Sequence, residues 1–181
     1  MELSIIFLPL IAAIISGFFG KYIGDRNSEI VTSALVSISA LLSIFVFYQV
    51  IVNQYEENIV IATWINSGSL DVNWSMLIDP LSAVMLVVVT SVSSLVHIYS
   101  IGYMSHDPHK PRFMAYLSLF TFAMLMLVTS DNFVQLFFGW EGVGLCSYFL
   151  IGCWFKKESA NAAAIKAFVV NRVGDFGFAL G

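Results

Sequence analysis

Charged residues are scarce in this 181-residue chain, at 11% of the total, whereas a soluble domain carries about 25%. Hydrophobic residues make up 59%, and the mean hydropathy is +0.86. A chain of this composition has too few polar side chains to cover a water-exposed surface, which excludes a soluble enzyme and a disordered segment. The composition instead indicates a protein of the lipid bilayer.

Basic clusters and cysteine motifs are missing as well. The net charge is −4 and no run of Lys or Arg occurs, which argues against nucleic-acid binding. The two cysteines, Cys146 and Cys153, show no spacing typical of a zinc or iron–sulfur site. Seven residues of helix separate them by about 10 Å, too far for a disulfide. We therefore predict no metal-binding residue in this chain.

Apolar runs long enough to cross a bilayer recur along the sequence. Roughly 20 helical residues span a hydrocarbon core about 30 Å thick. The sequence predicts an all-α integral membrane protein, with residues 1–181 forming a single membrane domain, a bundle of about six transmembrane helices. The predicted helices cover approximately residues 3–22, 29–52, 80–103, 112–129, 132–155 and 159–181. The last is still apolar at Gly181, so we expect the N-terminal fragment of a longer protein.

The long connection between the second and third predicted helices shows strand patterning. Residues 70–76 alternate apolar and polar, which is typical of a half-buried strand, and residues 59–65 are rich in β-branched and aromatic side chains. Residues 66–69, Asn-Ser-Gly-Ser, have turn chemistry. The pattern predicts an external β-hairpin over residues 58–78. An irregular amphipathic cap is the alternative.

The loop cations all fall in the first, third and fifth connections. They are Lys21, Arg26, Lys110, Arg112, Lys156 and Lys157. The second and fourth connections contain only acidic charges. By the positive-inside rule, the odd connections face the cytoplasm or its organellar equivalent, and the N-terminus lies outside.

Four charged residues lie inside the last two predicted helices: Glu141, Lys166, Arg172 and Asp175. Each such residue costs about 2.5 to 3.5 kcal/mol on insertion scales, so it is expected to face protein or trapped water and to find a partner. Arg172 and Asp175 are three residues apart and share a helix face, which predicts a local ion pair. Lys166 lies half a turn out of phase with Asp175. By helical rise, Glu141 lies at a depth between Lys166 and Arg172, within reach of either.

The surroundings of Glu141 favour a role in proton transfer. Gly139, Gly142, Gly144 and Ser147 allow close helix approach and leave room for ordered water. A carboxylate there is charged or neutral according to where the nearest cation lies, which is what a proton relay requires. The alternative is a static ion pair that holds the last two helices together. For Arg172 and Asp175 the two readings are nearly even, because these residues can neutralise each other.

Two further residues are candidate proton relays on weaker grounds. His97 lies near the predicted cytoplasmic end of the third helix, and imidazole titrates near neutral pH. A buried or interfacial histidine without function is an equal alternative. Asp79 precedes Pro80 at the start of that helix, a favourable place for an acid at a helix N-terminus.

Three motifs together resemble a known family. Residues 139–154 read GWEGVGLCSYFLIGCW, residues 162–175 read AAAIKAFVVNRVGD, and residues 79–82 read DPLS. They are similar to the antiporter-like chain 5 (subunit L) of respiratory complex I, the proton-pumping NADH:quinone oxidoreductase. The resemblance covers essentially the whole chain but only about the first third of that family's length.

The resemblance implies roles for the charged residues. In that family, the glutamate matching Glu141 is essential for pumping and pairs with a lysine of helix seven, which would lie beyond Gly181. Residues matching Lys166, Arg172 and Asp175 belong to charge networks within the subunit or against its neighbour. NADH, FMN, iron–sulfur clusters and quinone are bound by other subunits, so the resemblance implies no cofactor here. The implied partners are other membrane subunits, especially a neighbouring antiporter-like one, and lipid.

The leading hypothesis is therefore a membrane subunit of complex I that contributes to proton translocation, with no catalysis expected of this fragment alone. A subunit of a multisubunit cation/proton antiporter is the first alternative. The second is a structural membrane bundle whose buried charges only set helix register.

Overall fold

The computed structural model describes residues 1–68 and 70–181, and most of them are helical. In chain order the elements are α1 (Glu2–Ile23), α2 (Asp25–Asn53), β1 (Glu57–Ser67), β2 (Leu70–Ile78), α3 (Pro80–Tyr103), α4 (Lys110–Val128), α5 (Phe133–Ile151), the 3₁₀ turn η1 (Gly152–Trp154) and α6 (Glu158–Leu180). The predicted fold class, an all-α membrane bundle with a small antiparallel hairpin between the second and third helices, is confirmed.

Five of these helices, α1 to α5, are long and apolar enough to cross a membrane by length and composition. The sixth, α6, has 23 residues and is about 35 Å long by helical rise, which also suffices for the hydrocarbon core. It falls outside the group of five because it carries Lys166, Arg172 and Asp175. The chain is thus an integral membrane protein whose last helix is the most polar.

Two helix ends differ from the sequence-based expectation. α2 begins at Asp25, four residues before the predicted start at residue 29. Gly24 has a φ of 87°, which lets this single residue form the whole connection from α1. α5 ends at Ile151 and continues as the tighter turn η1, whereas a helix to Phe155 was expected. In that turn the Trp154 Nε1–H donates to an Asp107 carboxylate oxygen at 2.7 Å, which ties η1 to the α3–α4 connection.

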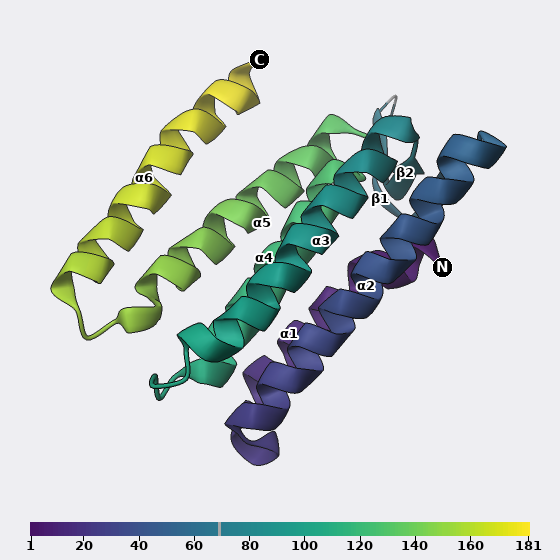
Figure 1. Ribbon diagram of the computed structural model, residues 1–181. Helices are drawn as coiled ribbons and strands as arrows, with labels where there is room; N and C mark the ends of the chain where they lie inside the picture. The colour runs from purple at the N-terminus through teal and green to yellow at the C-terminus, as the bar shows by residue number, and fades with distance from the viewer. Residues whose placement is uncertain (69) are drawn as a thin grey trace.

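Neighbouring helices run in opposite directions; α1 to α4 pack together as a group in which α4 also contacts α2 and α3, and α5 and α6 are added beside it in turn (Figure 1). α1 packs against α2 and α4, α2 against α3, α4 against α5, and α5 against α6. The α1–α2, α3–α4 and α5–α6 connections lie at one end of the bundle, which we call the odd-loop end. The hairpin and the α4–α5 connection lie at the other, which we call the hairpin end.

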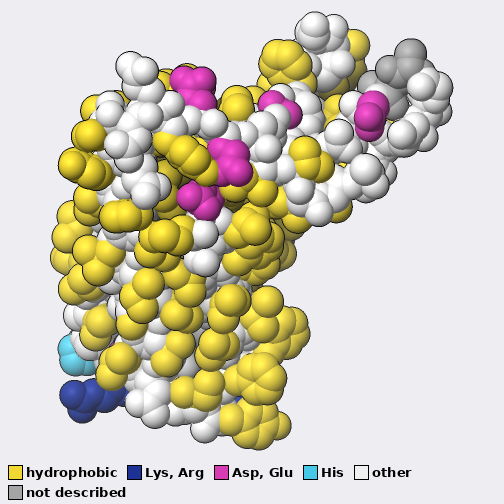
Figure 2. Space-filling model, turned by 90° about the vertical axis from the view of Figure 1, so that its right-hand side faces the viewer, with side chains coloured by type: hydrophobic (Ala, Val, Ile, Leu, Met, Phe, Trp, Pro, Cys, Tyr) yellow, Lys and Arg dark blue, Asp and Glu magenta, His cyan; other side chains and the backbone are white. Residues whose placement is uncertain are grey.

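The loop cations lie together at one end of the bundle. In the face that Figure 2 shows, dark-blue basic atoms and cyan histidine atoms lie at the lower end and acidic side chains at the upper end, with mostly apolar surface between them. The structure therefore brings the cationic odd connections to a common end, as the loop pattern predicts. Which side of the membrane that end faces stays a prediction.

The apolar core of the bundle lies at the hairpin end, where α1 to α4 meet β2. It consists of Ile5, Ile6, Val46, Val50, Met76, Ile78, Ala83, Leu86, Leu125 and Met126, all buried. Close by, Pro9 inside α1 has no N–H to give to the Ile5 carbonyl. The Ser39 hydroxyl of α2 donates to that carbonyl at 2.6 Å, so a neighbouring helix satisfies a group that lipid could not.

The hairpin is fastened along the outer edge of β2 to the α4–α5 connection and to the first turn of α5. The side-chain amide of Gln135, in α5, accepts from the Ser75 N–H at 3.0 Å and donates to the Ser75 carbonyl at 2.7 Å. The Leu77 N–H donates to the Thr129 carbonyl of the connection at 2.9 Å. These bonds cover the outer edge of β2, which leaves Ser75 buried against the predicted alternation. Of the predicted turn residues, Gly68 has the positive φ of 63°, and Ser69 lies outside the described residues.

Candidate functional site

Glu141 lies near the middle of α5, and α5 is held unusually close to α4 just before it. A Cβ on Gly139 would lie 2.7 Å from the Leu127 Cα of α4, a distance that real Cβ atoms do not show. Only glycine allows this approach, which fixes one face of α5 against α4. The Glu141 side chain, 22% exposed, points instead toward α6.

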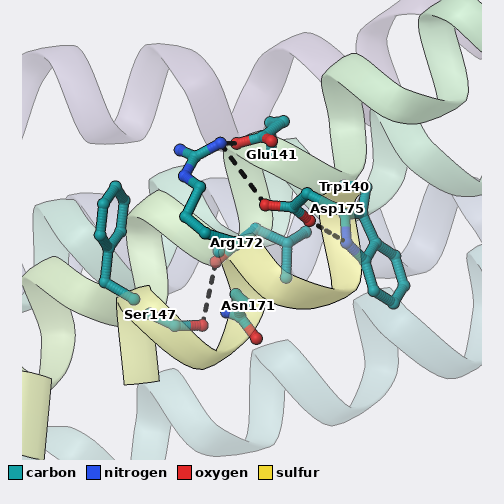
Figure 3. A pocket seen from close by; sticks show the side chains of 9 residues that line it. Trp140, Glu141, Ser147, Asn171, Arg172 and Asp175 are labelled. Carbon is teal, nitrogen blue, oxygen red and sulfur yellow. Dashed lines mark hydrogen bonds and ion pairs between the residues drawn. The ribbon is translucent and has the colours of Figure 1, made fainter. Parts of the chain in front are cut away.

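Arg172 of α6 is the residue that meets Glu141. Its guanidinium forms ion pairs with the carboxylates of Glu141 and Asp175, the second at 3.4 Å (Figure 3). It also lies 4.7 Å from the centre of the Phe168 ring, close enough for a cation–π interaction. One cation is therefore shared between two carboxylates on two helices, and its side chain is 46% exposed.

Asp175 is the buried member of this cluster, at 7% exposed. One of its oxygens faces Arg172 and the other accepts a hydrogen bond from the Trp140 Nε1–H at 2.9 Å. Sequence reasoning predicted the Arg172–Asp175 pair but gave Trp140 no role. The signal available was its position directly before Glu141, since neighbours on a helix point about 100° apart and can both face the same adjacent helix.

An open pocket separates α5 from α6 around these charges. Its lining is Trp140, Glu141, Val143, Gly144, Ser147, Phe168, Asn171, Arg172 and Asp175. A Cβ on Gly144 would lie 3.3 Å from the Asn171 amide nitrogen, so the small residue lets the two helices meet there. Polar groups at a helix–helix pocket can hold water.

Lys166, the fourth predicted member, lies apart from the cluster. It is exposed on α6, and among the described residues it forms no ion pair. Depth alone left Glu141 within reach of either Lys166 or Arg172, and the structure pairs it with Arg172. The phase argument that pointed Lys166 away from Asp175 agrees with this geometry.

His97 lies fully buried in α3 and faces α4. One ring nitrogen, Nδ1, lies 2.8 Å from the Ser93 carbonyl, and the other, Nε2, lies 3.0 Å from the Ser118 hydroxyl. Tyr99 and Tyr103 of the same helix are exposed and stack on each other. His97 is therefore an interior histidine with both nitrogens bonded, separate from the α5–α6 cluster.

Asp79 caps α3. Its side chain accepts a hydrogen bond from the Ser82 N–H at 2.7 Å, while the Ser82 hydroxyl accepts from the Asp79 N–H at 2.8 Å. This reciprocal capping box satisfies the start of the helix and occupies the carboxylate structurally. Within residues 1–68 and 70–181, no group of three His, Cys, Asp or Glu side chains is arranged to hold a metal ion.

These elements define a bundle of membrane helices with a charge cluster between its last two helices, the class of fold that residues 130–181 share with the NADH:quinone oxidoreductase/Mrp antiporter transmembrane family. Among solved structures, the chain is similar to the Mrp complex of Dietzia sp., with a TM-score of 0.80 and 23% identity over 99% of this chain and 18% of that one. It is also similar to the archaeal membrane-bound sulfane sulfur reductase, with a TM-score of 0.77 and 20% identity over 97% of this chain and 35% of that one. At these identities the likeness shows the fold alone.

Sequence comparisons identify the family. Residues 64–114 match the family described as NADH-ubiquinone oxidoreductase (complex I), chain 5 N-terminus, and residues 130–181 match that of the NADH:quinone oxidoreductase/Mrp antiporter transmembrane region. The chain is 58% identical to NADH-ubiquinone oxidoreductase chain 5 of Arabidopsis thaliana, over all of this chain and 27% of that one. It is 56% identical to NADH-quinone oxidoreductase subunit L of Rhodobacter capsulatus, over all of this chain and 26% of that one.

The chain belongs to the chain 5/subunit L family of NADH:quinone oxidoreductase, as the motifs in its fifth and sixth helices indicate. It spans about a quarter of the length of the curated relatives that it matches.

Proposed function

We propose that this chain is part of a membrane subunit of complex I that contributes to proton translocation coupled to electron transfer from NADH to quinone. The observation that carries the proposal is the sharing of Arg172 between Glu141 and Asp175 inside two membrane helices. Ionised groups at this depth are costly and mark proton or ion pathways. The family membership agrees with this use of them.

The proposed mechanism turns on the position of one cation. While the guanidinium of Arg172 lies beside Glu141, it favours the charged carboxylate. When the guanidinium moves fully to Asp175, Glu141 loses its counter-ion and takes up a proton. Trp140, bonded to Asp175, keeps that second carboxylate oriented to receive the guanidinium. Lys166 would serve a neighbouring charge outside this chain, and His97 would be a relay on a separate route.

The proposal extends to the surroundings of the chain. We assign the odd-loop end, with its six loop cations, to the cytoplasmic or matrix side and the N-terminus to the opposite side of an energy-transducing membrane. Residues 1–181 would act as a single membrane domain beside other membrane subunits, especially a neighbouring antiporter-like one. NADH, FMN, iron–sulfur clusters and quinone would be bound by other subunits.

The test is Glu141→Gln in the full-length protein within its complex. We expect proton pumping to be lost while the amount of assembled complex stays the same, because glutamine keeps the shape and removes the exchangeable charge. Glu57→Gln, on the exposed strand β1, is the matched control and should pump normally. Normal pumping by Glu141→Gln in an assembled complex would contradict the proposal and favour the structural role.

A cation/proton antiporter subunit is the second candidate, because the fold matches an Mrp complex. The 58% identity to chain 5 over the whole chain favours complex I. Co-purification decides between them: a complex I subunit brings down an NADH-oxidising partner, whereas an antiporter subunit does not.

A further inference from the structure

Two pockets follow each other along α5 and α6. The first is the pocket around Glu141 (Figure 3). The second is lined by residues of α4, α5, η1 and the first part of α6, among them Arg112, Tyr148 and Asn161. Their volumes are about 240 and 460 Å³, so each has room for several water molecules.

The directions of the two helices fix the order of the pockets. α5 runs from the hairpin end to the odd-loop end, and α6 runs back. By helical rise, Tyr148 lies about 10 Å along α5 from Glu141, toward the odd-loop end. Asn161 lies about 16 Å along α6 from Arg172 in the same direction. The second pocket is therefore nearer the odd-loop end, and we call it the odd-loop pocket.

Two aromatic rings meet between these pockets. Phe168 of α6 lines the pocket at Glu141, and Tyr148 of α5 lines the odd-loop pocket. Their ring centroids are 5.5 Å apart, a separation that aromatic pairs favour. Among the described residues, none lines both pockets. An apolar constriction of this kind interrupts a chain of water molecules, because water leaves it.

Of the two rings, Tyr148 is the better restrained. It lies 5.7 Å from the ring of Phe149, which in turn stacks on Tyr116 of α4 at 5.2 Å. Phe168 belongs to α6, which packs mainly on α5. A change at this contact is therefore a movement of Phe168.

The other neighbour of Phe168 is the cation of the charge cluster. The Arg172 guanidinium lies 4.7 Å from the centre of the Phe168 ring, and one turn of α6 separates the two residues. Asp175 lies about one turn from Arg172 in the opposite direction along α6. A guanidinium that moves fully onto Asp175 therefore leaves the Phe168 ring.

We propose that the contact of Phe168 with Tyr148 is a gate between the odd-loop pocket and Glu141. The inference rests on the proposed function. With the Arg172 guanidinium on Phe168, the gate is closed and Glu141 has its counter-ion. When the guanidinium moves to Asp175, Phe168 swings away from Tyr148. A proton then passes from water in the odd-loop pocket to a Glu141 carboxylate oxygen, and no electron moves. The cation that leaves Glu141 thereby selects the end from which the proton arrives.

The gate is tested with introduced thiols in the full-length protein within its complex. Ser147→Cys lies in the pocket at Glu141, and Ile165→Cys lies in the odd-loop pocket. The small cationic reagent 2-aminoethyl methanethiosulfonate is applied from the odd-loop side, with free cysteine on the other side to consume reagent that crosses. Tandem mass spectrometry locates each modification.

Removal of the ring should open the gate. We expect Phe168→Ala to raise the labelling rate of Ser147→Cys roughly tenfold, because thiol reactivity follows access of water to the thiolate. The rate of Ile165→Cys, on the odd-loop side of the gate, should not change. An unchanged rate at Ser147→Cys overturns the gate. An equal rise at both positions overturns it as well, since that result means general loosening of α6.

The part played by the cation is tested by Phe168→Leu and Phe168→Tyr. Both fill the space against Tyr148, but only the tyrosine keeps a ring face for the guanidinium. We expect Ser147→Cys to react several-fold faster with Phe168→Leu than with Phe168→Tyr, and Arg172→Gln to match Phe168→Leu. Equally slow labelling with Phe168→Leu and Phe168→Tyr would show that the cation does not hold the gate.

Pumping is measured on the same complexes. With Phe168→Ala, Glu141 is open to the odd-loop end in both positions of the cation, so we expect fewer protons pumped per NADH oxidised and an unchanged amount of complex. Val170→Ala, exposed on α6, is the matched control and should pump normally. An unchanged proton yield with Phe168→Ala overturns the gate. Failure of the proposed function appears differently, as normal pumping by Glu141→Gln, whereas failure of the gate alone leaves Glu141→Gln defective and the labelling contrast absent.

Discussion

The buried network around His97, among α2 to α4, and the ion cluster of α5 and α6 place ionisable side chains in the same membrane by different means. In the first, His97 is completely buried and both ring nitrogens have partners. In the second, Arg172 holds two carboxylates together but is nearly half exposed beside an open pocket. Three helices surround the histidine network, whereas α6 packs mainly on α5.

The difference reflects what each kind of group costs to bury. Hydroxyls and a neutral imidazole can be enclosed once each hydrogen bond is made, at little net cost. Burying an ion pair removes the hydration of both charges, and the attraction between them offsets only part of that free-energy cost. Ion pairs therefore remain near water or near other polar groups of the protein. The enclosed network is therefore built from neutral groups, and the charged groups of the cluster remain beside an open pocket.

The largest effect on pumping is expected from removing Arg172, the cation that Glu141 and Asp175 share in the cluster of α5 and α6. Arg172→Gln leaves Glu141 and Asp175 facing each other without a counter-ion. Removing one partner of a buried ion pair costs about 3 to 5 kcal/mol, and the exposure of Arg172 puts this case at or below the low end. We expect pumping to fall by at least roughly tenfold, and Arg172→Lys to retain part of it. Equal pumping by the two variants would show that the charge of this side chain is irrelevant.

The close contact of α5 with α4 at Gly139, which connects the two regions, should give the next largest effect. Gly139→Ala places a Cβ 2.7 Å from the Leu127 backbone and forces α5 away from α4. Overpacking of this kind typically costs about 1 to 3 kcal/mol. We expect a lower thermal unfolding midpoint of the detergent-solubilised complex. Gly102→Ala, where no atom lies within 4 Å of the new Cβ, is the control and should leave the midpoint unchanged.

In the first region, His97→Leu should separate packing from hydrogen bonding. The leucine fills most of the space but leaves the Ser118 hydroxyl without its partner, a loss of about 1 to 3 kcal/mol. His97→Gln can still bond to Ser118, and we expect it to unfold at a higher temperature than His97→Leu. The reverse order would mean that the interior there behaves as an apolar core.

Ser39→Ala should give the smallest effect. It removes the hydrogen bond to the Ile5 carbonyl, which Pro9 cannot satisfy. Hydrogen bonds between membrane helices average about 0.6 kcal/mol and reach about 1.7. We expect a small decrease in the thermal unfolding midpoint, with exposed Ser105→Ala as the reference. A decrease as large as that of Gly139→Ala would contradict this ranking.

Much of the fold could be predicted from the sequence because each signal was local. Apolar length marks a spanning helix, alternation marks a strand, and loop charge marks an end of the bundle. The Arg172–Asp175 pair could also be predicted, since both residues lie on one helix at a spacing of three. The helix ends at Asp25 and Ile151 could not, because apolar length does not detect helical turns that extend beyond the hydrocarbon core or tighten at its edge.

Contacts between helices could be predicted less well from the sequence. Helical rise gave the depth of Glu141 but not the direction in which α6 turns toward it, so Lys166 and Arg172 remained equivalent. The roles of Trp140 and Gln135 were missed for the same reason. Each depends on a residue at least 35 positions away.

The scarcity of charge by itself determined that this chain lies in a membrane, and the placement of the apolar runs and of the few charges determined where its helices run, to within a few residues, and which charges need partners there. The tertiary structure alone decided how those partners are chosen: Arg172 for Glu141 and Trp140 for Asp175. The physical reason is that burial in lipid depends on the length and hydrophobicity of a segment. The pairing of charges instead depends on the rotation of each helix about its axis, which is set by packing against its neighbours.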